Sequence, residues 1–184
     1  SNAFDRILGL ASTRPSLQAT LDGVFLDVGT GVGGVALRAA QTCPDLDIDA
    51  IDIWEPALRL AAGNVAASAH AGRIRLCRLD VTALDPGPRY TLAWLPTMFM
   101  KLPVLEQAID RIAAASCSGG WLIAPLYTRP DDPFMAMMSS LRTLRSGGEV
   151  TQSAQLEALL RARGYVDVEV EVGQIATFVM GRLA

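Results

Sequence analysis

The chain has 184 residues, of which 51% are hydrophobic and 19% charged, so its size and apolar fraction are those of one ordinary globular domain. Disordered and collagen-like chains are thereby excluded. Sixteen basic against nineteen acidic residues give a formal net charge of -3, the wrong sign for a surface that neutralises phosphates, so nucleic acid is not an expected partner. Because no run approaches the roughly 18 apolar residues of a membrane span, we expect no membrane contact either.

The cysteines and the chain ends bear on the cellular setting. Cys43, Cys77 and Cys117 form no CxxC pair, and with His70 as the single histidine they assemble neither a zinc site nor a disulfide framework. We therefore expect no metal, and reduced, mostly buried thiols in a cytoplasmic protein. Residues 1–3 resemble the remnant of a cleaved tag. We expect residues 4–184 to form a single domain, truncated from a longer chain with an N-terminal region.

Strands and helices alternate along the chain. Short apolar strands separated by helices predict an α/β fold, with a mostly parallel, doubly wound seven-stranded sheet, a C-terminal antiparallel β-hairpin and helices on both faces. In chain order the expected elements are one or two helices within 4–21 interrupted near Pro15, strand 24–28, helix 32–43, strand 46–51, a helix from Pro56 to about residue 69, strand 73–79, strand 90–95, helix 103–115, strand 121–126 after a turn at Gly119 and Gly120, helices 133–145 and 153–163, and hairpin strands 165–172 and 175–182.

A glycine-rich turn separates the first strand from the helix that follows it. Residues 25–34 read FLDVGTGVGG, at the place where open α/β sheets bind ligands. Glycines there permit positive φ and let the main chain touch a ligand without an intervening Cβ. The turn fits the dinucleotide pattern GxGxxG through Gly29, Gly31 and Gly34. It equally fits (D/E)xGxGxG, through Asp27, Gly29, Gly31 and Gly33.

Acidic residues at strand ends help to separate these two interpretations. Asp27 would repel a pyrophosphate but suits an ammonium group. Asp52 closes the second strand, where a carboxylate can accept both hydroxyls of a ribose in either type of cofactor. Asp80 ends the third strand and offers an acceptor for an adenine amino group. The expected C-terminal hairpin also disfavours a dehydrogenase domain, which normally finishes with a parallel strand.

On these residues the chain resembles the class I S-adenosylmethionine-dependent methyltransferases, which have a Rossmann-like fold. The resemblance runs from Val24 to the end through FLDVGTGVGG, IDAIDIWEPAL, RLDV, YTLAWLP, GGWLIAP and the hairpin. It implies S-adenosylmethionine as the cofactor, with S-adenosylhomocysteine as the product. It further implies that the cofactor contacts a set of residues from four strand ends: Asp27 at the ammonium group, Gly29, Thr30, Gly31 and Gly33 in the turn, Asp52 at the ribose, Ile53 or Trp54 on an adenine face, Asp80 and Val81 at the adenine edge, and a carbonyl of Trp94 or Leu95 at the methionine amine.

Each of these residues also has a purely structural interpretation. The glycine turn can serve tight packing alone, and Asp52 can be the N-cap of the helix that begins near Pro56. Asp80 can cap its own strand end. Trp54 and Trp94 can be core residues.

The sequence indicates the binding site of the methyl acceptor less clearly than that of the cofactor. His70 falls at the wrong end of the sheet for a catalytic base, so we expect it on the surface. Where amino-methylating enzymes of nucleic acids carry (D/N/S)PP(Y/F/W), residues 93–99 read AWLPTMF, which argues against adenine or cytosine N-methylation. We expect Met98 and Phe99, with Phe134 and Met138, to line an apolar acceptor pocket under a lid formed by residues 129–148. The alternative is that these methionines fill the core.

Polar groups near that pocket are few. Tyr127, Asp131 and Asp132 are the candidate catalytic residues, although a base is required only if the acceptor must lose a proton. The predicted function is methyl transfer from S-adenosylmethionine to a small, apolar molecule. The alternatives are an NAD(P)-dependent oxidoreductase and a non-catalytic domain that binds S-adenosylmethionine or S-adenosylhomocysteine but lacks its acceptor-binding part. A homodimer is a further expectation.

Overall fold

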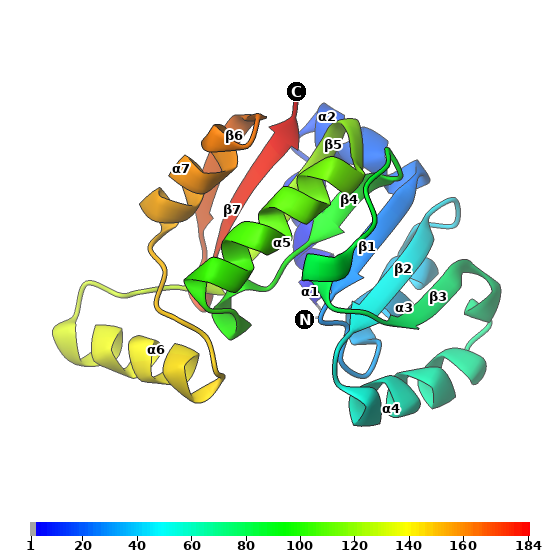
Figure 1. Ribbon diagram of the computed structural model, residues 1–184, viewed down its shortest axis with the longest axis horizontal. Helices are drawn as coiled ribbons and strands as arrows, with labels where there is room; N and C mark the ends of the chain where they lie inside the picture. Colours follow the sequence, from blue (N-terminus) through cyan, green and yellow to red (C-terminus); the bar gives the residue numbers. More distant parts are fainter. Residues whose placement is uncertain (1–2) are drawn as a thin grey trace.

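The computed structural model describes residues 3–184, in which one sheet carries helices on both faces (Figure 1). The strand order is β3-β2-β1-β4-β5-β7-β6, and β7 runs antiparallel to both of its neighbours while the other pairs are parallel. The strands are β1 (Val24–Val28), β2 (Asp47–Asp52), β3 (Ile74–Arg78), β4 (Tyr90–Trp94), β5 (Ser116–Tyr127), β6 (Tyr165–Val172) and β7 (Ala176–Leu183). The predicted sheet and its C-terminal hairpin are therefore confirmed.

The helices follow the predicted order. They are α1 (Ala3–Ala11), α2 (Pro15–Gln18), α3 (Gly34–Thr42), α4 (Glu55–Ala66), α5 (Leu102–Ala115), α6 (Pro133–Arg145) and α7 (Ser153–Ala162). Of the expected tag remnant, residues 1 and 2 lie outside the described residues, and Ala3 is the first residue of α1. Among residues 3–184, none of the helices is both long enough and apolar enough to cross a membrane.

Two hydrophobic cores sandwich the sheet. Because neighbouring residues of a strand point to opposite faces, Phe25 and Leu26 of β1 enter different cores. Phe25 packs against Phe4 of α1 with 5.5 Å between ring centroids, in the core that α3 also covers. Leu26 lies in the core covered by α5 and α7, together with Ile109 and Leu160. The apolar faces of these helices hold the strand ends in fixed positions.

The structure differs from the predicted elements at two glycine sites. Helix α3 begins at Gly34 rather than at residue 32, because Gly33 has the left-handed φ of 83°. Gly119 and Gly120 do not form a turn before a strand but lie within β5, which already begins at Ser116. There the pairing with β4 shifts, since residues 90 to 92 of β4 match residues 116 to 121 of β5. The extra residues form a bulge, which only the neighbouring strand reveals.

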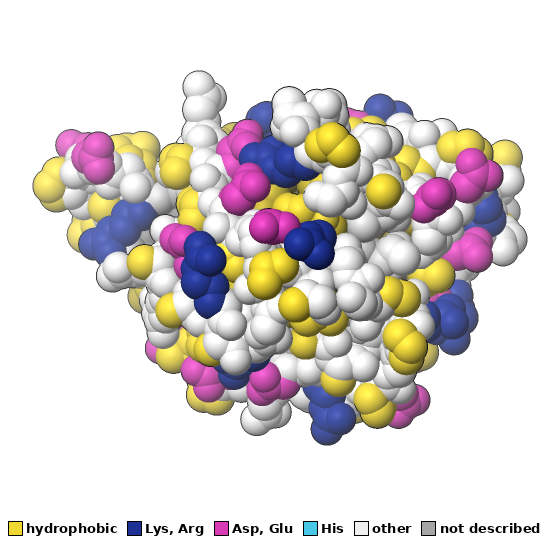
Figure 2. All heavy atoms as spheres, turned by 90° about the horizontal axis from the view of Figure 1, so that it is seen from above, with side chains coloured by type: hydrophobic (Ala, Val, Ile, Leu, Met, Phe, Trp, Pro, Cys, Tyr) yellow, Lys and Arg dark blue, Asp and Glu magenta, His cyan; other side chains and the backbone are white. Residues whose placement is uncertain are grey.

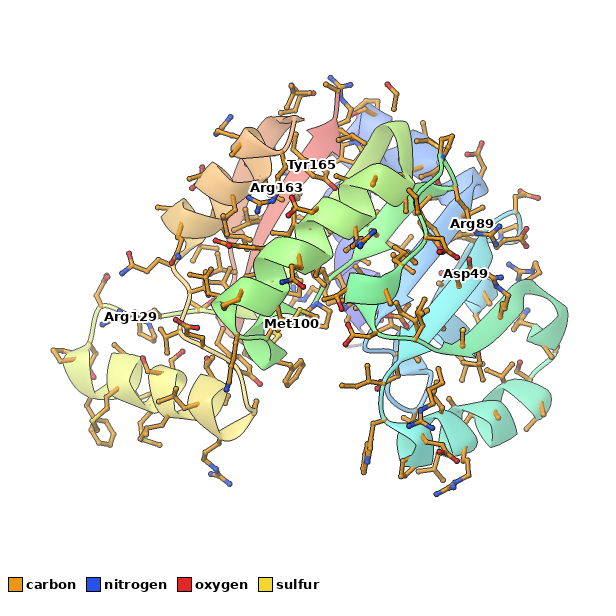
Figure 3. All side chains as sticks on the ribbon, viewed as in Figure 1. Asp49, Arg89, Met100, Arg129, Arg163 and Tyr165 are labelled. Atoms are coloured by element: carbon orange, nitrogen blue, oxygen red, sulfur yellow. The ribbon has the colours of Figure 1, made fainter. Side chains whose placement is uncertain are left out.

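A buried carboxylate of β2 binds side chains from β3 and from the start of β4 (Figure 3). Asp49 accepts hydrogen bonds from Arg75 at 2.8 Å, Arg89 at 2.7 Å and the Tyr90 hydroxyl at 3.1 Å. Burial opposes ionisation of this carboxyl group, yet the two arginines outweigh burial and hold its pKa below the ordinary value. The cluster therefore joins residues of β3 and β4 through a charged group of the strand between β1 and β3.

Charged side chains of both signs are mixed on the face seen in Figure 2, without a large basic patch. The three cysteines are free; Cys43 is buried, Cys117 half-buried and Cys77 exposed. The expectation of mostly buried thiols therefore holds for Cys43 alone.

Candidate functional site

The carboxyl ends of the parallel strands meet at one edge of the sheet, the lower edge in Figure 1, called here the carboxyl edge. The glycine turn after β1 lies at this edge. Gly29, Gly31 and Gly33 have φ values of 66°, 58° and 83°, a conformation that favours glycine. A Cβ built on Gly31 would meet nothing within 4 Å. The space beside the turn is therefore open, and backbone forms its wall.

Asp27 lies beneath this turn and is 1% exposed. Its Oδ2 accepts a hydrogen bond from the Thr30 hydroxyl at 2.7 Å. Burial raises the pKa of Asp27 to about 7, against the hydrogen bonds from Thr30 and from the backbone of Ala36, and the Asp52 charge adds to the rise. A carboxyl group in this state changes its charge near neutral pH and responds to any cation placed on the turn.

Asp52 connects the end of β2 to the glycine turn. Its Oδ2 accepts from the Gly31 N–H and its Oδ1 from the Trp54 N–H, each at 2.8 Å. Trp54 is the N-cap of α4, so Asp52 is not the helix cap that the sequence left as an alternative. An ionised carboxylate has about four acceptor positions. Two of these positions therefore remain for a ligand.

A first hollow of about 630 Å³ opens between the ends of β1, β2 and β3. Asp80 borders it but also accepts from the backbone N–H and the hydroxyl of Thr82, at 2.9 and 2.8 Å, as its structural interpretation predicts. Val104 is 40% exposed and lines this hollow. Predicted cofactor residues make up much of the lining: Gly29, Asp52, Ile53, Trp54, Asp80 and Val81.

A second hollow of about 730 Å³ adjoins the first, and Gly29, Pro96 and Phe99 border both. Trp94 forms part of its wall and packs against Phe178, with 6.3 Å between ring centroids. Leu95 is fully buried and lines none of the hollows described here. Residues of α1 and of the hairpin tip form the opposite wall.

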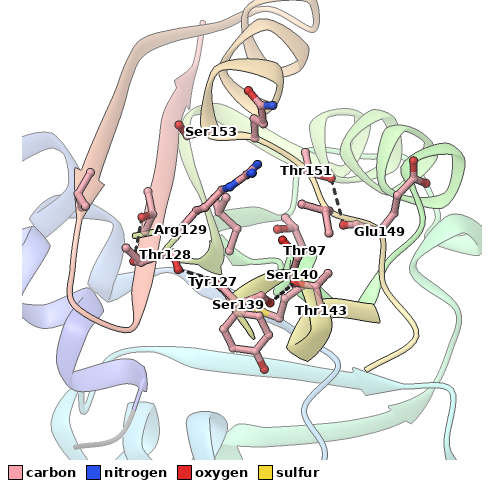
Figure 4. A pocket seen from close by; sticks show the side chains of 16 residues that line it. Thr97, Tyr127, Thr128, Arg129, Ser139, Ser140, Thr143, Glu149, Thr151 and Ser153 are labelled. Atoms are coloured by element: carbon pink, nitrogen blue, oxygen red, sulfur yellow. Dashed lines mark hydrogen bonds between the residues drawn. The ribbon is translucent and has the colours of Figure 1, made fainter. Parts of the chain in front are cut away.

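A third hollow of about 300 Å³ lies between the end of β5, α6 and residues 149–153 (Figure 4). Met98 and Tyr127 border both the second and the third hollow. The three hollows therefore form a row along the carboxyl edge. Sequence reasoning missed most of the polar lining of the third: Thr97, Thr128, Arg129, Ser139, Ser140, Thr143, Glu149, Thr151, Gln152 and Ser153.

Helix α6 faces the opposite way from the predicted orientation. Phe134 and Met138, expected to line an acceptor pocket, are 63% and 45% exposed and border none of the three hollows. The helix turns Ser139, Ser140 and Thr143 toward the third hollow instead. Apolar periodicity defines a face of a helix, but the packing partner decides whether that face points inward. The sequence did carry a signal for this orientation, because Ser139, Ser140 and Thr143 are spaced so that they lie on one polar face of the helix.

The candidate catalytic residues separate in the structure. Tyr127 borders the second and third hollows, and the Arg142 guanidinium carbon lies 5.2 Å from the centroid of its ring. Asp132 caps α6 by accepting from the Met135 N–H at 2.9 Å. Asp131 is exposed and borders none of these hollows. Tyr127 is thus the one of the three that the structure places at the hollows.

Two further predictions concern histidine and metal. His70 is half-buried and precedes β3, so it lies away from the carboxyl edge, with its Nδ1 3.4 Å from an Arg73 nitrogen. Within residues 3–184, His, Cys, Asp and Glu side chains form no group of three or more that could hold a metal ion.

Comparisons with known proteins identify the family. Residues 25–120 match a family model described as a methyltransferase domain. The tRNA1(Val) (adenine(37)-N6)-methyltransferase of Tolumonas auensis is 40% identical over 149 residues, which are 77% of this chain and 57% of that enzyme. Because the model matches more than half of the chain, the chain belongs to the methyltransferase family.

Solved structures agree on the fold. Human N-acetylserotonin methyltransferase, solved with S-adenosylmethionine, is 18% identical, with a TM-score of 0.72 over 98% of this chain and 55% of that one. An O-methyltransferase from neocarzinostatin biosynthesis, solved with S-adenosylhomocysteine and 1,4-dihydroxy-2-naphthoic acid, is 18% identical, with a TM-score of 0.71 over 96% of this chain and 61% of that one. The chain spans less than two thirds of each of these three proteins.

The residues present fit the cofactor of this family, S-adenosylmethionine. The turn around Gly31 presents bare backbone to open space, and Asp52 retains free acceptor positions in the first hollow. The buried Asp27 lies beneath the same turn. The chain thus belongs to the methyltransferase family, and the residues at its carboxyl edge fit S-adenosylmethionine.

Proposed function

Starting from this family membership, we propose that the protein transfers a methyl group from S-adenosylmethionine to a small-molecule acceptor that binds in the second and third hollows. The observation that carries the proposal is the row of three adjoining hollows at the carboxyl edge, with shared walls at Gly29 and Tyr127. A nucleoside in the first hollow and an acceptor in the third would meet in the second. Open α/β sheets bind ligands at this edge.

We assign the amino-acid part of the cofactor to the glycine turn. Gly29, Gly31 and Gly33 would lie along it with bare backbone, and Thr30 holds the Asp27 carboxyl group beneath them. Since Asp27 is 1% exposed, its negative charge would act on the ammonium group through the turn or through water.

The adenosine part is assigned to the first hollow. The free acceptor positions of Asp52 suit the two ribose hydroxyls. Ile53 and Trp54, each 65% exposed, are available to cover the adenine, and Asp80 and Val81 border the same space. Trp94 borders the second hollow, where a backbone carbonyl of Trp94 or Leu95 would reach the methionine amine.

The chemistry requires alignment more than acid or base. S-adenosylmethionine supplies an electrophilic methyl group on a positively charged sulfur. The residues of the second hollow must hold the acceptor in line and exclude water, and such alignment alone can contribute about 7 to 11 kcal/mol. Tyr127 is the polar side chain best placed to orient an acceptor atom, because it borders both the second and the third hollow.

A nucleic-acid acceptor is the second candidate, because the Tolumonas relative acts on tRNA. Against it, β4 ends in Trp94, followed by Leu95, Pro96 and Thr97, so no carboxylate or amide side chain stands there to accept from an adenine amino group. The Thr97 hydroxyl already donates to the Pro125 carbonyl oxygen at 2.8 Å. The net charge of -3 also disfavours a phosphate backbone.

Labelled methyl transfer distinguishes the candidates. The protein is incubated with methyl-labelled S-adenosylmethionine and either a metabolite extract or total tRNA. We expect label in the small-molecule fraction only. Label in tRNA would overturn the proposal, and tight S-adenosylhomocysteine binding without any transfer would indicate the non-catalytic alternative. The Asp52→Ala variant, which should fail to bind the nucleoside, serves as the background control.

The remaining expectations stay predictions. These are a cytoplasmic location, a homodimer, and a single domain over residues 4–184. The lid over residues 129–148 likewise stays a prediction.

A further inference from the structure

The third hollow contains one cationic side chain, Arg129, just beyond the end of β5. In Figure 4 this side chain extends from the strand end toward the segment that carries Thr151 and Ser153. Within residues 3–184 its guanidinium donates no hydrogen bond and forms no ion pair. Other arginines near the strands, such as Arg75 and Arg89, are paired with a carboxylate. Arg129 is therefore a free donor in the wall of a hollow.

The acidic residue of the same hollow does not compete for Arg129. Glu149 accepts a hydrogen bond from the Leu102 N–H at 3.1 Å, at the start of α5. A carboxylate at a helix N-terminus is favourably placed against the helix dipole. Glu149 is thus held at the start of α5, and within residues 3–184 it forms no ion pair with Arg129.

Five of the hydroxyl groups that line the hollow donate their protons to backbone carbonyl oxygens. Thr128 donates to the Gly173 carbonyl oxygen at 2.6 Å, Ser139 to the Thr128 carbonyl oxygen at 2.9 Å, and Ser140 to the Ala136 carbonyl oxygen at 3.0 Å. Thr97 and Thr143 donate to backbone carbonyl oxygens as well. Since each hydroxyl has one proton, these groups offer a ligand their oxygens as acceptors. The hollow therefore combines one strong cationic donor with several acceptors.

We propose that the third hollow binds the carboxylate of a small hydroxy acid through Arg129, with the hydroxyl groups of that acid donating to the serine and threonine oxygens. The hollow adjoins the second at Met98 and Tyr127, which line both, so the other end of such an acid would lie on the side of the transfer position. This inference rests on the proposed function, and it replaces an apolar acceptor with a polar, anionic one.

A matched pair of probes tests the inference. Binding of 3,4-dihydroxybenzoate and of catechol, which lacks only the carboxylate, is measured by calorimetry on protein saturated with S-adenosylhomocysteine. We expect the acid to bind about tenfold or more tightly, because a carboxylate on arginine forms charge-assisted hydrogen bonds. This preference should shrink at high salt, since Arg129 is exposed.

Three variants locate the effect. Arg129→Gln should abolish the preference for the acid while it leaves catechol binding unchanged. Arg145→Gln, on α6 but outside the lining of the hollow, should leave both affinities unchanged. Thr143→Val should weaken both probes and preserve their ratio, because it removes an acceptor and not the cation.

Equal binding of the two probes, a preference that survives in Arg129→Gln, or no binding of either probe would overturn the inference. Failure of the proposed function looks different. In that case S-adenosylhomocysteine does not bind, or the methyl label appears in tRNA.

Discussion

The two ends of the row of hollows are built in different ways. The first hollow is built around the ends of β1, β2 and β3, where Asp52 accepts hydrogen bonds from the N–H groups of Gly31 and Trp54, and residues 99–104 and 146–147 complete its lining. The third is formed by side chains of α6 and of residues 149–153, which lie outside the parallel strands. A site built around strand ends depends on the geometry of the sheet, whereas a site built on a helix and a connecting segment can change its specificity one residue at a time. We expect the cofactor end to be rigid and the acceptor end to carry the specificity.

The largest effect is expected at the cofactor end. Asp52→Ala removes the carboxylate that ties the turn to β2 and that would accept the ribose hydroxyls. Loss of two hydrogen bonds to a charged group should weaken S-adenosylhomocysteine binding about a hundredfold. Calorimetry measures this directly. Asp47→Ala, an exposed position at the other end of β2, is the matched control and should bind normally. An unchanged affinity in Asp52→Ala would remove the ribose assignment.

A change in the middle of the sheet should separate stability from binding. Asp49→Ala leaves the buried Tyr90 hydroxyl without its partner and removes the hydrogen bonds from Arg75 and Arg89. We expect the free energy of unfolding to fall by about 2 kcal/mol, as measured by urea denaturation. At temperatures where the variant is folded, its affinity for S-adenosylhomocysteine should equal that of the native protein. A large loss of affinity would mean that the carboxyl edge is less rigid than we infer.

The pH dependence of cofactor binding tests Asp27. With a pKa of about 7, this carboxyl group is mostly ionised at pH 8 and mostly protonated at pH 6. Its attraction for an ammonium group should therefore fall over that range, weakening S-adenosylhomocysteine binding about tenfold. Asp27→Asn should bind weakly with a flat profile. A native profile as flat as that of the variant would show that Asp27 does not act on the ammonium group.

Stability should respond to the same group with a defined sign. Because burial raises the pKa of Asp27 from 3.8 to about 7, the folded chain holds more protons than the unfolded chain between these values. The contribution of Asp27 to the free energy of unfolding therefore decreases as the pH rises through that window, by at most about 1.4 kcal/mol per unit. Denaturation at pH 5 and pH 7.5 should show Asp27→Asn gaining stability relative to the native protein at the higher pH.

The smallest effect is expected on the outer face of α6. Phe134→Ser and Met138→Ser change exposed side chains that border none of the three hollows. Binding of S-adenosylhomocysteine and of the hydroxy-acid probe should stay within twofold of the native values in calorimetry. A strong loss of probe binding would restore the apolar acceptor pocket that the sequence suggested.

Local sequence signals predicted most of the fold. The bounds of β1, α6 and β6 agree with the prediction to the residue, because turn and capping residues flank them. The bulge at Gly119 and Gly120 could not be predicted, since it depends on the register against β4. The register between two strands that are far apart in the chain cannot be predicted from the local sequence of either strand.

The cofactor end of the candidate site was predicted better than the acceptor end, for a related reason. Residues that directly follow a strand, such as Gly29 and Asp52, must lie at the carboxyl edge of a parallel sheet. Thr143 reaches the third hollow only through the packing of α6, whose apolar stripe suggested the opposite orientation. The direction in which a helix turns is a tertiary property, so the acceptor end could not be read from periodicity.

The shared walls at Pro96, Phe99, Met98 and Tyr127 have a thermodynamic consequence. Whatever occupies the second hollow forms part of the surface that a ligand meets on either side. The two binding equilibria are then linked, and linkage is reciprocal: the factor by which the nucleoside changes the affinity for the acceptor is the factor by which the acceptor changes the affinity for the nucleoside. The affinity of this protein for the nucleoside should therefore depend on whether the acceptor is bound, and the reverse.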